Sequence, residues 1–186
     1  MNDKLGHQIE QKIDELLGEF RANPEIVLTE DDVRCQLYMK LKSVRELSEL
    51  CETADGGGVR SLPLHTEVRW YGDNGKLRYR SDIVIIPVSN LITRNRPSFK
   101  LPSKSYGFDG PVAIIELKLR RRNGPSDAKF KKEIQSDLEK LEELKKKVSE
   151  RSKRYLVILD KRESIRDNLP ENNSETIFRY VSVSDD

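Results

Sequence analysis

Between residues 112 and 119 the chain reads Val-Ala-Ile-Ile-Glu-Leu-Lys-Leu, and this stretch decides the fold. Its dense apolar content is typical of a strand that is buried on both faces of a sheet. Side chains alternate along a strand, so Glu116 and Lys118 project to one face while Ile115 and Leu117 project to the other. Burying an unpaired charge costs several kcal/mol, so an acid and a base at this position require partners.

Two helices are predicted before this strand. Apolar residues recur at helical spacing from Leu5 to Phe20, and Asn23-Pro24 ends that first amphipathic helix. Thr29 is a suitable N-cap for a second helix that begins at Glu30 and runs to about residue 50. When its apolar stripe is projected one turn back, it reaches Glu30, so a carboxylate continues a buried face.

A β-hairpin is predicted between the second helix and the decisive strand. Residues 64–71 and 76–88 are rich in β-forming residues, and the tetrapeptide Gly72-Asp73-Asn74-Gly75 joins them. The second of these strands ends in the apolar run Ile83-Val84-Ile85-Ile86, which Asp82 directly precedes. Residues 89–110 lack periodicity and contain two prolines, which indicates a long surface loop.

The C-terminal part of the chain predicts a helix over residues 130–148 and strands over 155–159 and 176–183. A strand, a helix and a second strand in this order favour a parallel crossover. The fold class is therefore α/β, with a mixed central β-sheet of about five strands flanked by helices. We expect a single domain overall, in which residues 1–22 form an N-terminal amphipathic helix and residues 23–186 form the α/β domain.

Composition narrows the classes of protein to which the chain can belong. The formal net charge is only +2, so any affinity for nucleic acid must come from local clusters of Lys and Arg. The two cysteines, Cys35 and Cys51, form no Cys-x-x-Cys pair, which argues against a zinc site or a disulfide framework, and we expect both to be buried. The first residues carry acids and no apolar run, and no run of ~20 apolar residues occurs, so we expect no signal peptide and a cytoplasmic protein with no membrane partner.

The acids near the two strand ends predict a metal site. Asp82 and Glu116 converge at neighbouring strands, where two carboxylates repel one another unless a cation lies between them. Mg²⁺ prefers oxygen ligands, so Asp82, Glu116 and the backbone carbonyl of Leu117 are candidate ligands, and Mn²⁺ would substitute for it. Glu30 could hold a second metal or a metal-bound water. Lys118 would orient the attacking water and offset charge on the phosphorus.

This pattern resembles that of the restriction-endonuclease-like nuclease superfamily, whose motif is an acid, a variable spacer, and then acid-x-Lys on the next strand. Here the motif reads Ser81-Asp82 and then Glu116-Leu117-Lys118, with Ser81 in place of the customary proline. The resemblance spans residues 29–159. It implies a mixed α/β sandwich and Mg²⁺-dependent endonuclease cleavage of DNA, although the superfamily also covers enzymes that act on RNA. It also admits a homodimer, for which the first helix is the candidate interface.

Further residues are predicted to contact DNA or to support the site. A run of three arginines directly follows the strand of Glu116, and the loop over residues 89–110 is basic. The residues that we expect to bind DNA are Arg94, Arg96, Lys100, Lys104, Arg120, Arg121 and Arg122. The resemblance implies that Gln135, in the helix after the decisive strand, supports the catalytic residues, while a solvated helix face is the alternative.

Three alternatives remain open at this point. Glu116 and Lys118 could form an ordinary ion pair at a solvent-facing strand end. The chain could be a catalytically inactive nucleic-acid-binding module on the same fold. It could also be a protein-interaction module that assembles through its first and third helices.

Overall fold

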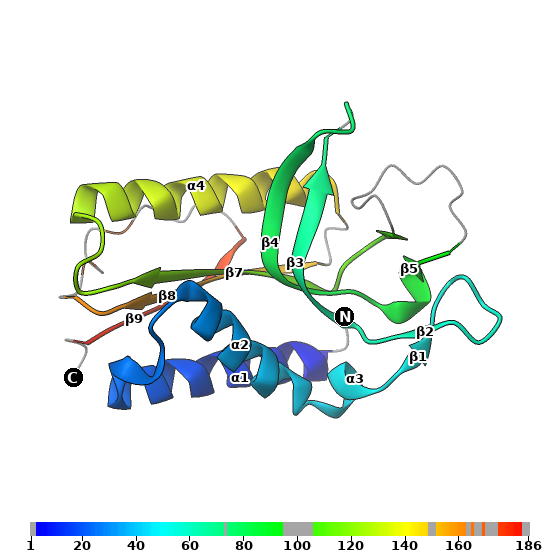
Figure 1. Cartoon of the computed structure of the whole chain (residues 1–186), viewed down its shortest axis with the longest axis horizontal. Helices are drawn as coiled ribbons and strands as arrows, with labels where there is room; N and C mark the ends of the chain where they lie inside the picture. The colour runs from blue at the N-terminus through cyan, green and yellow to red at the C-terminus, as the bar shows by residue number, and fades with distance from the viewer. Residues whose placement is uncertain are drawn as a thin grey trace.

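A mixed sheet of five strands forms the centre of the protein in a computed structural model of the chain (Figure 1). The structure describes residues 3–72, 74–94, 106–148, 152–162, 165, 169 and 175–183. In spatial order the strands are β3 (Leu64–Tyr71), β4 (Leu77–Ile85), β7 (Ala113–Arg120), β8 (Lys153–Asp160) and β9 (Ile177–Ser182). β4 is antiparallel to both β3 and β7, and β7, β8 and β9 run parallel to one another. The predicted α/β class, the mixed sheet and the parallel crossover are confirmed.

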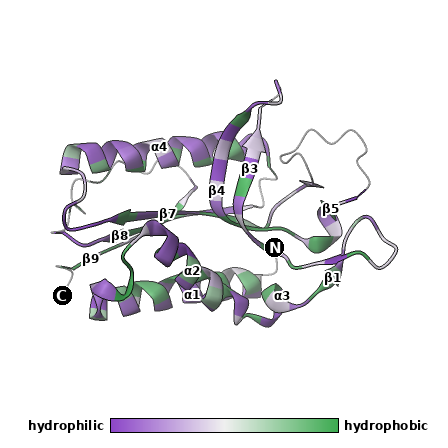
Figure 2. Cartoon of the chain, viewed as in Figure 1, coloured by the Kyte–Doolittle hydropathy of each residue, from purple (hydrophilic) through white to green (hydrophobic). Residues whose placement is uncertain are grey.

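Helices cover both faces of this sheet. One face packs against α1 (Asp3–Ala22) and α2 (Glu30–Lys42), and the other packs against α4 (Asp127–Lys145) (Figure 1). Each interface contains its own cluster of buried apolar side chains. Hydrophobic and hydrophilic residues alternate along α1 and α4 (Figure 2), as expected for helices with one buried face.

The apolar stripe of α1 belongs to the core of the chain itself. Ile9, Ile13, Leu16 and Phe20 are fully buried, and the helix contacts α2, β8 and β9. The first helix is therefore predicted correctly as an element, but its apolar face is already covered. A dimer interface through this helix, as predicted, would have to use its exposed face.

The second helix begins where the sequence predicts and ends earlier. Thr29 caps it, since Asp32 N–H donates to Thr29 Oγ1 at 3.1 Å and Thr29 N–H donates to Asp32 Oδ2 at 2.9 Å. It ends at Lys42 because both the N–H and the hydroxyl of Ser43 bond to the carbonyl of Lys40. The predicted stripe continues through the short α3 (Arg45–Ser48), so the burial pattern is confirmed although the helix is broken.

The β3–β4 hairpin leaves the sheet partway along its length. The β3–β4 ladder extends from Leu64–Ile85 to Tyr71–Leu77, whereas β4 pairs with β7 only through residues 83–85. The outer part of the hairpin therefore projects from the sheet on the side of α4 (Figure 1). We call this part, residues 67–72 and 74–81, the hairpin arm.

Short elements occupy the remaining connections. They are η1 (Pro24–Ile26), β1 (Cys51–Glu52), β2 (Arg60–Ser61), η2 (Val88–Asn90), β5 (Leu91–Ile92) and β6 (Gly107–Phe108). The predicted loop over residues 89–110 is thus more structured than expected, because β5 pairs with β6 and buries Leu91 and Phe108. Both cysteines are free and exposed, so the prediction that they are buried is wrong. No helix in the described part of the chain is long and apolar enough to cross a membrane.

Candidate active site

The gap that opens where β4 leaves β7 is lined by acidic side chains. The N–H of Leu117 donates to Asp82 Oδ2 at 2.8 Å, and the N–H of Leu119 donates to Glu30 Oε2 at 3.2 Å. Beyond Ile115 these amides have no partner strand, so the two carboxylates satisfy the free edge of β7. Because the N–H and C=O of one strand residue point to the same side, the carbonyl of Leu117 also faces this gap.

Glu116 is the buried acid of the site. Only 2% of its side chain is exposed, and its Oε2 lies 2.5 Å from the ammonium of Lys140 on α4. Its other oxygen, Oε1, is buried and has no hydrogen-bond partner among the described residues. Burial raises the pKa of Glu116 to about 8 although Lys140 lowers it, and the nearby carboxylate of Asp82 raises it further.

Lys118 lies on the same face of β7 and contacts acids from two helices. Its Nζ is 3.0 Å from Asp137 Oδ2 on α4 and 3.9 Å from Glu30 Oε2 on α2. Burial lowers the pKa of Lys118, but Asp137, Glu30 and Asp82 together raise it above its usual value. The pKa of Glu30 is raised, mainly by burial and against the influence of Lys118. The amine is therefore held in its charged form between the carboxylates.

Arg34 borders the site on the side of α2. Its guanidinium forms ion pairs with Asp31 and Glu67 and lies 3.7 Å from Asp82 Oδ1. Glu67 has a φ of 56°, the only non-glycine residue in the left-handed region within the described chain. Such a conformation is unfavourable for a residue with a Cβ and is concentrated at functional sites. The strained residue thus lies where the hairpin bends away from the sheet, directly beside the acids.

The structure brings together four of the predicted residues, namely Asp82, Glu116, Lys118 and Glu30. Gln135 is not among them, since it is exposed and bonds to Glu139 one turn further along α4. The rotation of α4 instead directs Asp137 and Lys140 toward the sheet. The placement of Gln135 beside the site is therefore wrong. Lys140 and Arg34 are absent from the sequence-based prediction, because no short motif links them to the acids.

The predicted DNA-binding residues fall in several environments. Arg120 is fully buried, bonds to Asp160 through two nitrogens and pairs with Asp127, so its guanidinium is inaccessible to a phosphate and its prediction is wrong. Arg121 and Arg122 are exposed, and Arg122 pairs with Glu25. Arg94 is also exposed. Arg96, Lys100 and Lys104 lie outside the described residues.

The donor atoms of this gap suit a hard divalent cation. They comprise the carboxylates of Asp82 and Glu116, the carbonyl of Leu117 and, close by, Glu30, and one buried oxygen of Glu116 has no partner. However, no three acidic, histidine or cysteine side chains in the described part of the chain are arranged as a ready set of metal ligands. Lys140 and Arg34 neutralise the acids instead. The chemistry of the donor atoms fits Mg²⁺, but the protein's own cations, Lys140 and Arg34, already pair with the carboxylates.

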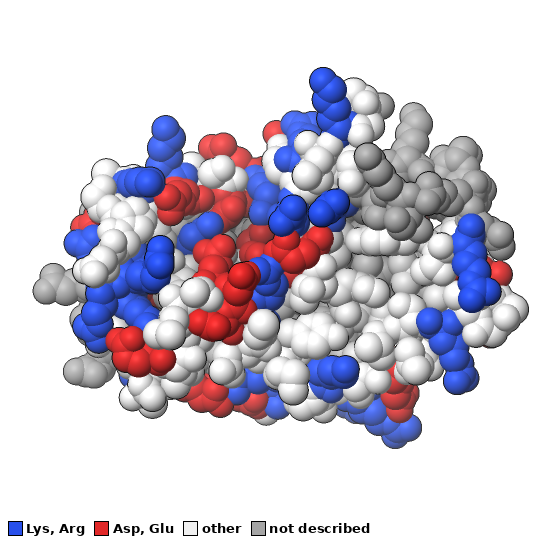
Figure 3. All heavy atoms as spheres, in the orientation of Figure 1, with Lys and Arg blue, Asp and Glu red and all other residues white. Residues whose placement is uncertain are grey.

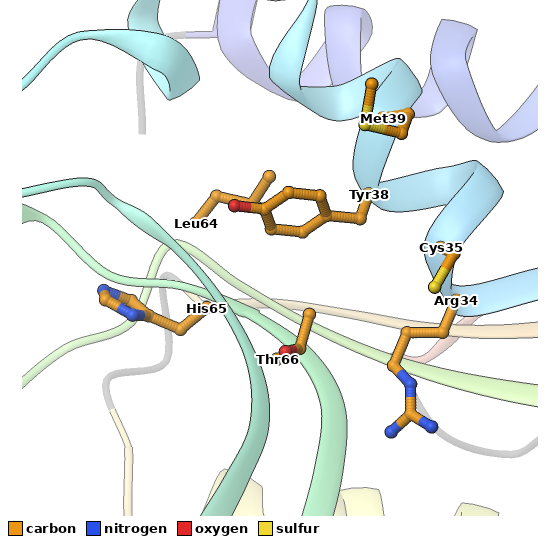
Figure 4. Close-up of a pocket in the computed structure, with 7 residues that line it drawn as sticks. All are labelled: Arg34, Cys35, Tyr38, Met39, Leu64, His65 and Thr66. Atoms are coloured by element: carbon orange, nitrogen blue, oxygen red, sulfur yellow. The ribbon is translucent and has the colours of Figure 1, made fainter. Parts of the chain in front are cut away.

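A groove of about 490 Å³ adjoins the acids on the outer side of β3. Figure 4 shows it between α2, which contributes Arg34, Cys35, Tyr38 and Met39, and β3, which contributes Leu64, His65 and Thr66. Arg34 belongs to both the groove and the acidic site. Through Arg34, the groove therefore adjoins the residues of the candidate active site.

No protein-family model matches the chain, and comparisons with curated proteins and with solved structures found no match. A function must therefore be argued from the geometry of the site and from the sequence motif.

Proposed function

We propose that the chain is a metal-dependent nuclease that hydrolyses phosphodiester bonds in DNA. One observation carries this proposal. Asp82 and Glu116 project from adjacent strands into the gap where those strands separate, and Lys118 lies on the same face with Glu30 beside it. The acid and acid-x-Lys motif predicts that these residues lie together, and this supports the proposal.

Each residue has a distinct role in the proposed reaction. Asp82, Glu116 and the carbonyl of Leu117 would hold a Mg²⁺ ion, with Glu30 positioned for a second ion or a bound water. When bound, the ion polarises a phosphate oxygen and lowers the pKa of a coordinated water. Lys118 orients the attacking water and offsets negative charge on the phosphate. Asp137 holds the ammonium of Lys118 in place.

The burial and strain at this site support a functional role. Glu116 is a nearly fully buried carboxyl with a strongly raised pKa, and such groups are concentrated at active sites. Glu67, which pairs with Arg34 near Asp82, retains an unfavourable backbone conformation. Glu116 and Lys118 are not paired with each other, since their partners are Lys140 and Asp137.

Substitution of the acids and the lysine tests the proposal. We expect Asp82→Asn and Lys118→Ala to reduce cleavage by about 100-fold or more with unchanged circular dichroism, since each removes a group that acts on the reacting phosphate. Asp109→Asn and Lys132→Ala, at exposed positions, are the matched controls. The assay uses Mg²⁺ and Mn²⁺ with duplex DNA, single-stranded DNA and RNA. Full activity in both site variants would refute the assignment.

A specific observation also favours a non-catalytic nucleic-acid-binding module. The carboxylates of Asp82 and Glu30 already accept the free amides of β7, and Lys140 neutralises Glu116, so the acids are satisfied without a metal. A wild-type protein that binds nucleic acid but cleaves none of the substrates with either metal would establish this second function.

The proposal extends to the compartment and the assembly of the protein. Two exposed, unpaired cysteines suit a reducing compartment, so we place the activity in the cytoplasm. Cleavage of both strands of a duplex suits a two-fold pair of sites, so a homodimer remains part of the proposal. Its interface would be a surface other than the buried stripe of α1.

A further inference from the structure

Three arginines lie on the hairpin arm beside the candidate active site. Arg69 on β3 and Arg80 on β4 are direct cross-strand partners, and Arg78 lies two residues from Arg80 on the same strand. Directly opposed side chains share a face of the hairpin, and like charges at such positions destabilise it. Arginines in this arrangement therefore indicate a surface adapted to bind anions.

The opposite face of the arm is packed against the protein. Val68, Trp70 and Ser81 are buried there, and the indole N–H of Trp70 donates to Ser81 Oγ at 2.9 Å. Tyr79 reaches Glu143 on α4. Because one face is fixed in this way, the face that carries Arg69 and Arg80 is directed to solvent.

The three guanidinium groups are accessible and only partly neutralised. Arg69 is exposed and forms no ion pair with any residue that the structure describes. The side chains of Arg78 and Arg80 are each 48% exposed. Arg78 pairs with Glu143 and also donates to the Tyr79 hydroxyl at 3.1 Å, and Arg80 pairs with Glu67. Exposed pairs of this kind contribute little to stability, so a phosphate can replace the carboxylates at small cost.

The arm leads directly to the acidic site. Arg80 is two residues from Asp82 along β4, which is about 7 Å for an extended strand. Glu67, the partner of Arg80, also pairs with Arg34 next to Asp82. In Figure 3 basic side chains lie beside a central group of acidic ones on this face. A phosphate chain held by the arm would therefore run toward Asp82 and Glu116.

We infer that the outer face of the hairpin arm is a nucleic-acid-binding surface, on which Arg69, Arg78 and Arg80 contact backbone phosphates of the strand that enters the acidic site. This inference rests on the proposed nuclease function and identifies how the substrate is held. Contacts to phosphates position a strand without selecting its sequence, so the arm confers affinity and not base specificity.

The test measures binding of the full-length protein to a fluorescein-labelled single-stranded DNA by fluorescence anisotropy, in EDTA to prevent cleavage. We expect each of Arg69→Gln, Arg78→Gln and Arg80→Gln to weaken binding about three- to tenfold, uniformly across DNA sequences. The triple variant should also lower the slope of log K against log salt by about 2, since each phosphate contact contributes about 0.7. Arg80→Lys, which keeps the charge, should retain most of the affinity.

The matched control is the triple variant Lys4→Gln, Arg21→Gln, Arg45→Gln, whose exposed cations lie on α1 and α3 across the sheet. Circular dichroism checks that all variants fold. Three results would overturn the inference. They are equal losses of affinity in the arm and control variants, an unchanged salt slope in the triple arm variant, and binding of polyglutamate but not of DNA. Arm-dependent binding without any metal-dependent cleavage would support the arm and refute the nuclease. Metal-dependent cleavage that is unaffected by the arm variants would support the nuclease and refute the arm as its nucleic-acid-binding surface.

Discussion

The ammonium of Lys140 lies 2.5 Å from Oε2 of Glu116 and 3.0 Å from the carbonyl oxygen of Arg80. One side chain of α4 thus bridges β7 and the base of the hairpin arm at the point where β4 leaves the sheet. It also supplies the positive charge that a divalent cation would supply to Glu116. The protein therefore holds its buried acid with an internal cation, and a metal ion must compete with it.

This competition predicts that Lys140→Gln tightens metal binding. Glutamine can still bond to Glu116 and to the carbonyl of Arg80, but it carries no charge to compete with the ion. We expect the dissociation constant for Mn²⁺, measured by electron paramagnetic resonance of free Mn²⁺, to fall about tenfold, which corresponds to about 1.4 kcal/mol. Lys132→Gln, on the same helix and exposed, should leave it unchanged. Weaker binding in Lys140→Gln would mean that the lysine positions Glu116 for the metal.

Shortening a buried side chain of α1 should cause a large loss of stability without a change in the assembly of the protein. Ile13 is fully buried in the cluster between α1 and the sheet. Ile13→Ala should reduce the free energy of unfolding by about 2–5 kcal/mol, because it removes buried methyl groups and leaves a cavity. The molar mass from light scattering should equal that of the wild type. A variant with near-native stability and an altered mass would instead place α1 at an interface between chains.

Loss of the helix cap at Thr29 predicts a smaller destabilisation. The Thr29 hydroxyl and the Asp32 carboxylate bond reciprocally to backbone amides at the start of α2, one residue before Glu30. Thr29→Ala should reduce the free energy of unfolding in urea by about 1 kcal/mol. Thr66→Ala, at an exposed position of β3, is the control and should have a smaller effect. Equal effects of the two substitutions would show that the cap contributes nothing specific.

His65 predicts a pH dependence of stability. Burial lowers the pKa of His65 below its usual value of 6.5, against a backbone hydrogen bond to Leu62 that raises it. The unfolded chain then binds a proton more readily than the folded one, so stability is lost as pH falls below about 6.5, by at most about 1.4 kcal/mol per pH unit for one proton. Urea unfolding at pH 7.5 and 5.5 should show a larger decrease for the wild type than for His65→Gln. An identical decrease in both proteins would contradict this origin.

Much of the fold follows from local patterns in the sequence. Thr29 and Asp32 specify the start of a helix, and the turn that contains Asn74 and Gly75 specifies the hairpin. Both signals act over a few residues, so neighbouring elements do not alter them. The end of α2 was less predictable, because it depends on how Ser43 competes for the carbonyl of Lys40.

Some residues of the candidate site can be predicted from the local sequence, and others depend on how the helices pack on the sheet. Alternation along β7 places Glu116 and Lys118 on one face, and this required only the strand assignment. Lys140 and Arg34 depend on the rotation of α4 and α2 against the sheet, which no local pattern fixes. For Arg120, the local sequence predicts an exposed side chain, whereas tertiary packing buries it. A run of three arginines suggests a solvated surface, but Asp160 at the end of β8 provides a buried partner for the first of them.

The most direct test of a shared metal site is a crystal structure of the protein soaked in Mn²⁺, with anomalous diffraction data. We expect a peak between the carboxylates of Asp82 and Glu116, about 2.1 Å from their oxygens and from the carbonyl of Leu117, with Lys140 moved away from Glu116. A map without a peak there, with Lys140 still bonded to Glu116 at saturating Mn²⁺, would contradict a metal-dependent nuclease centred on these residues.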